Sequence, residues 1–170
     1  MILGVVSDTH LPRFGTALPA YLRDGLRRAK VDAILHAGDI TEPFTLELLE
    51  EIAPVIAVAG NNDGKNLRAK LGERRIIEAG DARIGLVHGH DGKGKSTPDR
   101  AFNAFAEDEV NAIVFGHSHI PYRLRRDGIL LFNPGSPTDK RMNPLYSYGI
   151  LRVNGANVSA AHRFSLTRST

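Results

Sequence analysis

Short apolar runs alternate with helical patterns in the first half of the chain. Three largely apolar runs have the length and β-branched content of strands that are buried on both faces. They cover residues 2–6, 33–37 and 55–59. Apolar residues recur at helical spacing over residues 18–29, and Thr41 followed by Pro43 indicates the N-cap and first turn of a second helix. This strand–helix–strand repetition predicts right-handed crossovers and a parallel sheet at the start of the chain.

Turn signals separate most of the apolar runs in the second half. Three hairpins are predicted from Gly80-Asp81 and the similar turns that follow: residues 75–78 with 82–87, 122–125 with 129–132, and 148–153 with 158–160. Between the first two hairpins, Thr97 opens a helix that turns Phe102, Phe105 and Ala106 inward, and residues 112–115 form a buried strand. Two β layers with helices outside them would cover all these apolar faces, so we expect one compact α/β domain over residues 1–170.

Composition narrows the class of protein. The chain has 170 residues, of which 42% are hydrophobic and 24% charged, as in an ordinary globular domain. Its net charge of +3 favours anionic ligands but is small for a dedicated nucleic-acid binder. The absence of cysteine excludes disulfides, thiolate metal sites and cysteine nucleophiles. Because the sequence also has no signal peptide and no apolar run long enough to span a membrane, we expect a cytoplasmic protein with no membrane partner.

Polar side chains follow five of the predicted strands at the point where each strand ends. Ligand sites of α/β sheets form beyond the carboxyl ends of the strands, so we expect these five segments to face one region. The segments are Asp8-Thr9-His10, Gly38-Asp39, Gly60-Asn61-Asn62-Asp63, His88-Gly89-His90 and Gly116-His117-Ser118-His119. The chain has 7 histidines, and only His36 and His162 lie outside these segments.

Each segment alone has an ordinary explanation. An Asp after a strand often caps a turn, an Asn-Asn-Asp run is a common polar turn, and a buried His is often structural. Their coincidence at five strand ends favours a shared site. Imidazole and carboxylate without thiolate suit Mn, Fe, Ni, Zn or Co in a catalytic centre rather than a structural zinc site.

Taken in order, the five segments resemble the signature of the calcineurin-like metallophosphoesterase superfamily. The short chain and its Asn133-Pro134-Gly135-Ser136 segment resemble the small microbial phosphodiesterase branch (YfcE-type). The resemblance implies a four-layer αββα sandwich, in which two mixed β-sheets are flanked by helices, and two divalent metal ions, with Mn favoured over Ni, Fe, Zn or Co. By position, the first ion would take Asp8, His10 and His119, and the second Asn61, His88 and His117, with Asp39 bridging both.

Position 62 departs from the pattern of many superfamily members, which carry His there. Asn62 cannot deliver a proton as a general acid, and such a proton typically contributes about 10²–10⁴-fold to the rate. We therefore expect activity on phosphodiesters rather than on monoesters with poor leaving groups. Asn62 and His90 are the candidates for substrate contact, and His90 is the candidate catalytic side chain, because both lie one or two residues from an expected ligand.

The expected function is hydrolysis of a small phosphodiester by a hydroxide that the two metal ions activate. A first alternative is a non-catalytic adaptor, because the same superfamily resemblance includes a subunit of an endosomal sorting complex that uses this fold as a binding surface. A second is a nuclease, against which the mild charge and the short chain argue. Every expected ligand position carries a competent side chain, which favours the enzyme. The resemblance also allows a homo-oligomer.

Overall fold

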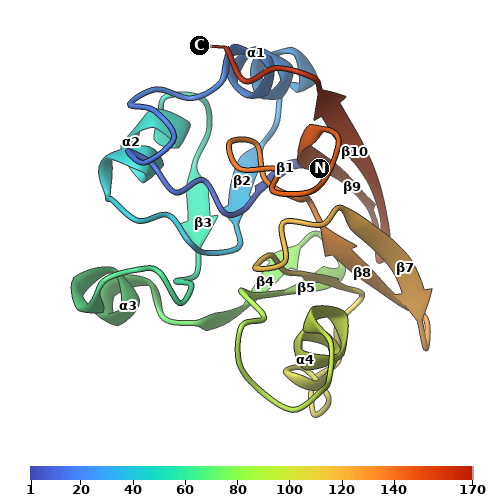
Figure 1. The fold of residues 1–170 in the computed structure, drawn as a ribbon. Helices are drawn as coiled ribbons and strands as arrows, with labels where there is room; N and C mark the ends of the chain where they lie inside the picture. The colour runs from blue at the N-terminus through green and yellow to red at the C-terminus, as the bar shows by residue number, and fades with distance from the viewer. Residues whose placement is uncertain (170) are drawn as a thin grey trace.

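Two five-stranded sheets pack face to face in the computed structural model, which describes residues 1–169 (Figure 1). The first sheet has the order β10 (Asn157–Ser165), β9 (Tyr146–Asn154), β1 (Ile2–Val6), β2 (Ala33–His36) and β3 (Val55–Ala57). The second has the order β4 (Arg74–Ala79), β5 (Ala82–Val87), β6 (Ala112–Val114), β8 (Ile129–Asn133) and β7 (Tyr122–Arg126). The helices are α1 (Ala20–Ala29), α2 (Phe44–Glu50), α3 (Lys65–Leu71) and α4 (Thr97–Asn103).

Both sheets are mixed. Strands β1, β2 and β3 are parallel, as predicted, while β9 runs antiparallel to β1 and β10 antiparallel to β9. In the second sheet β5, β6 and β8 are parallel, and the hairpin partners β4 and β7 close the two edges in the antiparallel sense.

Helices cover the outer face of each sheet, which confirms the expected αββα sandwich. Leu22 and Leu26 of α1 and Leu49 of α2 pack with the apolar residues on the outer face of β1 and β2. On the other side, Ala101 of α4 and Phe105 just beyond it pack against β6 (Figure 1). The core between the sheets is formed by alternate residues of both, among them Val5, Leu35, Leu86, Val114 and Phe132.

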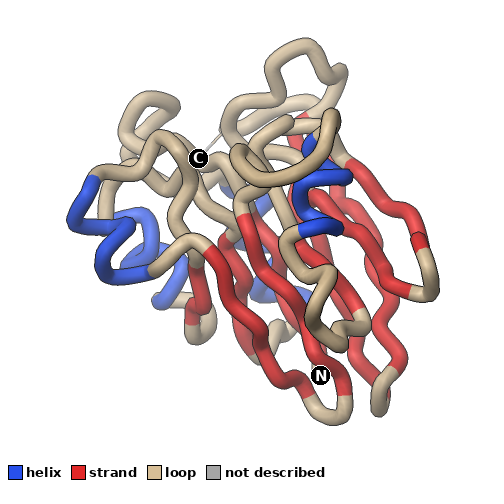
Figure 2. Tube along the Cα trace, turned by 90° about the horizontal axis from the view of Figure 1, so that it is seen from below, coloured by secondary structure: helices blue, strands red, loops and turns tan. Residues whose placement is uncertain are grey.

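The loops that follow the parallel strands gather at one end of the sandwich, and the N-terminus lies at the other (Figure 2). The two sheets contact each other there directly. The ring of His88, after β5, lies 2.7 Å from the carbonyl oxygen of Ala37, after β2. Within residues 1–169, no helix is both long and apolar enough to cross a membrane.

Three details differ from the sequence prediction. The pattern predicted no helix at Lys65–Leu71, where α3 buries only Leu67. Thr41 is not the N-cap of α2: the helix begins after Pro43, and Thr41 has a φ of 77°. The inward position expected for Ala106 is wrong, because α4 ends at Asn103 and the helical spacing ends with it, so Phe105 is buried and Ala106 is exposed.

Candidate metal centre

The seven expected ligand side chains meet where the two sheets end. The loops after β1, β2 and β3 supply four of them, and the loops after β5 and β6 supply three. They are Asp8, His10, Asp39, Asn61, His88, His117 and His119. Residues that are far apart along the chain thus lie within contact distance, because parallel strands deliver their carboxyl ends to the same edge.

A first group of ligand atoms surrounds Asp8. The Nε2 atom of His119 lies 3.4 Å from Asp8 Oδ1 and 3.3 Å from His10 Nε2. The two imidazole rings are stacked, with their centroids 5.2 Å apart. The potential ligand atoms of these three side chains all lie within 4.8 Å of one another, and all three residues are buried.

A second group lies around His88. Its Nε2 atom is 3.3 Å from Asp39 Oδ2, 3.9 Å from Asp8 Oδ1 and 3.1 Å from Asn61 Oδ1. The same Asn61 oxygen lies 3.1 Å from His117 Nδ1, so one amide oxygen faces two imidazoles. Asp39 Oδ2 is also 3.6 Å from His10 Nε2, and both carboxylates therefore reach both groups.

Backbone carbonyls fix the orientation of two of these histidines. His88 Nδ1 donates to the carbonyl of Ala37 at 2.7 Å, and His119 Nδ1 donates to the carbonyl of Asp139 at 2.6 Å. In each ring the other nitrogen, Nε2, is turned to the carboxylates. This arrangement is the usual one for histidine metal ligands, since the outer hydrogen bond selects the tautomer.

The charges of the centre act on each other strongly. Burial alone would lower the pKa of His88, but the hydrogen bond to Asp39 and the charges of Asp8 and Asp39 raise the pKa to about 9. Burial would raise the pKa of Asp39, but hydrogen bonds from His88 and Asn62 hold it well below its usual range. A proton on His88 therefore neutralises part of the negative charge in the metal-free protein, and a bound cation would take over that role.

The backbone of the site is strained. Nine non-glycine residues of the described chain have positive φ, and six of them belong to these loops. The six are Asp8 (56°), His10 (47°), Asp39 (56°), Thr41 (77°), His117 (65°) and His119 (62°). Such conformations cost of order 1–3 kcal/mol each and cluster at functional sites. The fold holds these side chains in place at a cost to its stability.

One oxygen of Asp8 tests whether the residues fit a cation. Asp8 Oδ2 accepts a hydrogen bond from the backbone N–H of His117 at 3.0 Å, whereas the buried Oδ1 has no hydrogen-bond partner among the described residues. Three imidazole nitrogens lie within 4.0 Å of that oxygen. Carboxylate oxygen and imidazole nitrogen are the donors that Mn, Fe, Ni, Co and Zn share, so the set fits a divalent ion.

The two residues expected to touch substrate lie at the edge of the centre. Asn62 donates to both oxygens of Asp39, from its side chain to Oδ2 at 2.7 Å and from its backbone to Oδ1 at 2.8 Å. The ring of His90 lies against those of His88 and His117, with centroids 5.4 and 6.2 Å apart. Burial and the neighbouring His88 lower the pKa of His90. Asn62 thus orients a carboxylate of the centre.

Polar residues that are not expected ligands support the ligand loops, one of them within the five segments and two beyond them. Asp63 accepts hydrogen bonds from the backbone N–H of Asp39 at 3.0 Å and of Gly60 at 2.7 Å, which joins the loops after β2 and β3. Ser136 Oγ donates to the carbonyl of Asp8 at 2.8 Å, and Asn133 Nδ2 donates to that of Gly116 at 2.8 Å. The carbonyl of Asp139 was not anticipated, because backbone acceptors leave no signal in a sequence.

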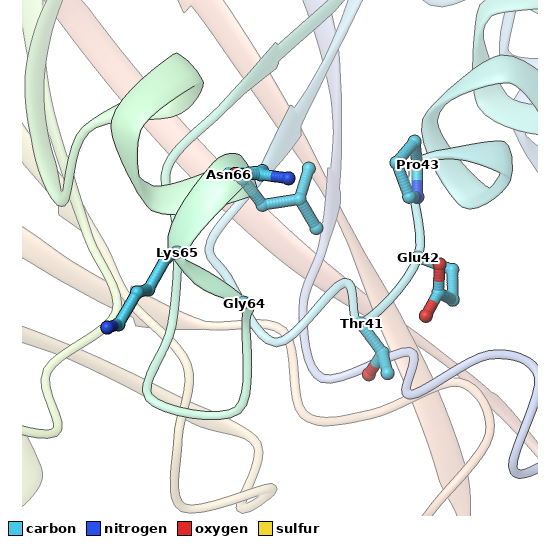
Figure 3. A pocket seen from close by; sticks show the side chains of 7 residues that line it. Thr41, Glu42, Pro43, Gly64, Lys65 and Asn66 are labelled. Atoms are coloured by element: carbon cyan, nitrogen blue, oxygen red, sulfur yellow. The ribbon is translucent and has the colours of Figure 1, made fainter.

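Two cavities flank the loop that contains Thr41. One, of about 350 Å³, opens beside the centre and is lined by His10, Arg13, Thr41, Asn62, Asp139 and Arg141. The other, of about 330 Å³, separates the segment before α2 from the start of α3 (Figure 3). None of the seven expected ligands lines the second cavity.

Comparisons with known proteins agree with this geometry. Residues 1–156 match the family model of the calcineurin-like phosphoesterase superfamily domain. The chain is 35% identical to a probable metallophosphoesterase of Methanothermobacter thermautotrophicus, over 94% of this chain and 90% of that protein. It is 30% identical to a phosphodiesterase of Methanocaldococcus jannaschii, over 79% and 83%. The crystal structure of Vps29 from Entamoeba histolytica complexed with zinc has the same fold, with a TM-score of 0.79, 24% identity and coverage of 96% and 99%.

Proposed function

The chain belongs to the calcineurin-like phosphoesterase superfamily, and from that premise we propose that it hydrolyses phosphodiester bonds with two divalent metal ions. The observation that carries the proposal is the unpartnered Asp8 Oδ1, which three imidazole nitrogens surround within 4.0 Å. A buried carboxylate oxygen without a donor is costly unless a ligand completes it. A cation is the ligand that this donor set fits best.

In the proposed assignment, Asp8, His10 and His119 hold one ion, and Asn61, His88 and His117 hold the other. Asp39 is shared, which agrees with the position of its Oδ2 atom at 3.6 Å from His10 and 3.3 Å from His88. When bound, two such ions supply a water of lowered pKa and positive charge beside the phosphoryl oxygens. Manganese is the ion we propose first, and Ni, Fe, Zn and Co suit the same mixture of nitrogen and oxygen donors.

The side chains around the ligands support a diester substrate. Asn62 holds Asp39 in place and offers no proton to a leaving group, which disfavours monoesters with poor leaving groups. His90 is proposed to contact the substrate. Because burial lowers its pKa, its ring is neutral near pH 7 and can accept a proton or donate one N–H to a phosphoryl oxygen.

The test is Asp39→Asn, which preserves shape and removes charge. In the manganese-loaded protein we expect turnover of bis(p-nitrophenyl) phosphate to fall by more than about a hundredfold. A loss of about ten- to a hundredfold is typical when only a residue that hydrogen-bonds to a metal ligand is removed, so a larger loss indicates that Asp39 is itself a ligand. Bound metal, measured by mass spectrometry, should fall in parallel. Asp81→Asn, on the exposed turn between β4 and β5, is the matched control and should leave both unchanged. Full metal-dependent turnover by Asp39→Asn would refute the scheme.

The same assay separates the alternatives. A metal-loaded wild-type protein that turns over neither diesters nor monoesters would favour the adaptor. The fold that the chain shares with Vps29 is the reason to consider that alternative. Activity confined to polynucleotides, with a steep fall as salt is raised, would favour a nuclease.

A further inference from the structure

The cavity of about 350 Å³ beside the metal centre is lined by residues that belong to the centre and by residues that do not. His10 and Asn62 are shared with the centre. Arg13 and Arg141 lie outside it, and neither is within ion-pair distance of any carboxylate in residues 1–169. Four other arginines of the described chain do form ion pairs: Arg23, Arg68, Arg74 and Arg126. The cavity therefore presents two exposed guanidinium groups, neither of which is held in an ion pair within the described residues.

We propose that this cavity binds a second phosphate of the substrate. The preferred substrate is then a phosphodiester in which one of the two ester groups carries a further phosphomonoester. This inference rests on the proposed function, because it places the scissile phosphate at the metal centre and the second phosphate at the arginines. A guanidinium is the protein group best matched to phosphate, since its fixed fork of N–H donors engages two oxygens at once.

Arg13 lies beside an aromatic ring, which it shares with Arg168. Its guanidinium carbon lies 5.3 Å from the centre of the Phe14 ring, and the same ring meets His10 edge-on with centroids 6.3 Å apart. Phe14 thus spans the distance between a metal-ligand candidate and the arginine. Stacking on an aromatic face leaves the N–H edge of a guanidinium available to an anion.

Thr41 supplies an independent sign of a ligand. It is β-branched, and its φ of 77° is rare for such a residue and costly. A hydrogen bond of 2.6 Å from its backbone N–H to Asp63 Oδ1 holds it there. Its Oγ1 atom is buried without a partner in the part of the chain that the structure describes. In Figure 3 the side chain is directed away from Pro43 and Asn66. A strained residue in the wall of a cavity is typical of a ligand-binding site.

Asp139 is the only carboxylate among the six lining residues, and it is already engaged. Its Oδ2 atom lies 3.6 Å from His119 Nδ1, and its Oδ1 atom accepts from the backbone N–H of Arg141 at 3.3 Å. Two arginines against one aspartate leave the cavity with net positive charge. A phosphomonoester carries about −1.5 to −2 charges at neutral pH, so it suits this cavity better than a neutral or singly charged group does.

The experiment measures kcat/KM of the manganese-loaded protein for three substrates: thymidylyl-thymidine, and the same dinucleotide with a 5′- or a 3′-terminal phosphate. We expect one phosphorylated form to be preferred over the unphosphorylated one by about tenfold or more, the scale of one charge-assisted bidentate contact. Arg13→Ala and Arg141→Ala should each lower that preference by about tenfold. The corresponding Lys variants should retain part of it, because the charge remains and the fork is lost.

Arg152→Ala is the matched control. Arg152 is exposed on β9 and pairs with Ile2, at the end of the sheet opposite the metal centre, so the preference should not change. Glycerol-linked diesters with and without a terminal phosphate form a second pair. A preference in both pairs shows that phosphate alone is recognised, and a preference only for the dinucleotide shows that the nucleoside contributes as well.

Two results would overturn the inference alone: a wild-type protein that hydrolyses bis(p-nitrophenyl) phosphate but has equal kcat/KM for all three dinucleotides, or a preference that survives both alanine variants. A wild-type protein that hydrolyses none of the diesters would instead overturn the proposed function, and the inference with it.

Discussion

The pKa values of two buried histidines of this chain are shifted in opposite directions, because the neighbours of the two rings differ. His36 is fully buried below the loop of Asp39. Its Nδ1 accepts from the N–H of Gly38 at 3.2 Å, and its Nε2 lies 3.1 Å from Thr9 Oγ1. Burial, and after it the charge of His88, lower the pKa of His36 to about 3. His88 faces two carboxylates, and its pKa is raised to about 9. The position of each ring relative to Asp8 and Asp39, rather than its burial, therefore decides whether the histidine is charged.

Acid should destabilise the metal-free protein through His36. Its folded pKa lies below the unfolded value of about 6.5, so the stability that the neutral ring contributes is complete above pH 6.5 and is lost as the pH falls toward 3. One such proton gives a slope of up to about 1.4 kcal/mol per pH unit. The free energy of unfolding in urea at pH 7, 6 and 5 should therefore fall less steeply for His36→Gln than for the wild type. Parallel curves for the two proteins would show that His36 is not the group responsible.

At the scale of elements, the loops after β2 and β3 form one unit. The Asp63 carboxylate accepts hydrogen bonds from the N–H groups of Asp39 and Gly60, and the Asn62 amide donates one to the carboxylate of Asp39. The carboxylate in turn packs directly on Gly60, where a Cβ would overlap both the backbone nitrogen and the carboxylate of Asp39. Gly60 is therefore required by close approach, and not by a positive φ.

Gly60→Ala tests this unit. The added methyl group must displace Asp39, so we expect metal affinity to fall by about ten- to a hundredfold, as for other changes to outer-shell support. The free energy of unfolding should fall by about 1–3 kcal/mol, because the site is overpacked. Isothermal titration with Mn²⁺ and urea denaturation measure the two effects.

Gly64→Ala is the control for this substitution. Gly64 lies four residues further on, has a φ of −66°, and no atom lies within 4 Å of the place of a Cβ. Its stability should stay within about 0.5 kcal/mol of the wild type, and its metal affinity should not change. Equal metal affinity in Gly60→Ala and Gly64→Ala would contradict the close approach of Asp39 to Gly60.

At the scale of the whole molecule, the candidate metal centre joins the two sheets. Asp8 and Asp39 follow strands of the first sheet, while His88 and His117 follow strands of the second. The core between the sheets is otherwise apolar, so this end of the sandwich is held by hydrogen bonds between loops such as that from His117 to Asp8. An ion that binds only when both sheets are in place stabilises the folded state by mass action.

Metal loading should therefore raise the thermal unfolding midpoint. At a free Mn²⁺ concentration of about 100 times Kd, the stabilisation is about 2.7 kcal/mol. For a chain of this length it corresponds to a rise of roughly 5–10 °C in Tm, which differential scanning calorimetry resolves. Excess chelator should reverse the shift, and Asp39→Asn should show much less of it. An unchanged wild-type Tm at saturating Mn²⁺ would mean that binding of the ion does not depend on the packing of both sheets.

Local pattern determined most of the elements and the place of the candidate site. The apolar runs that precede Asp8, Asp39, Asn61 and His88 are strands. They could be predicted because a continuous run of β-branched residues indicates a strand buried on both faces. The pattern did not reveal α3, whose helix buries only Leu67, and it gave Thr41 the role of an N-cap that it does not have. Short helices with a weak apolar face depend on their tertiary neighbours.

Tertiary structure decided what each polar side chain faces. Nothing local to Asn62 indicates that its amide holds Asp39, and nothing local to Arg141 indicates that it shares a cavity with Arg13, 128 positions away. Periodicity reports which side of an element is buried, but contacts between loops depend on how the two sheets are stacked. Strand ends could be read from the chain because burial follows local order, whereas the partners of a charge are fixed only when distant segments pack together.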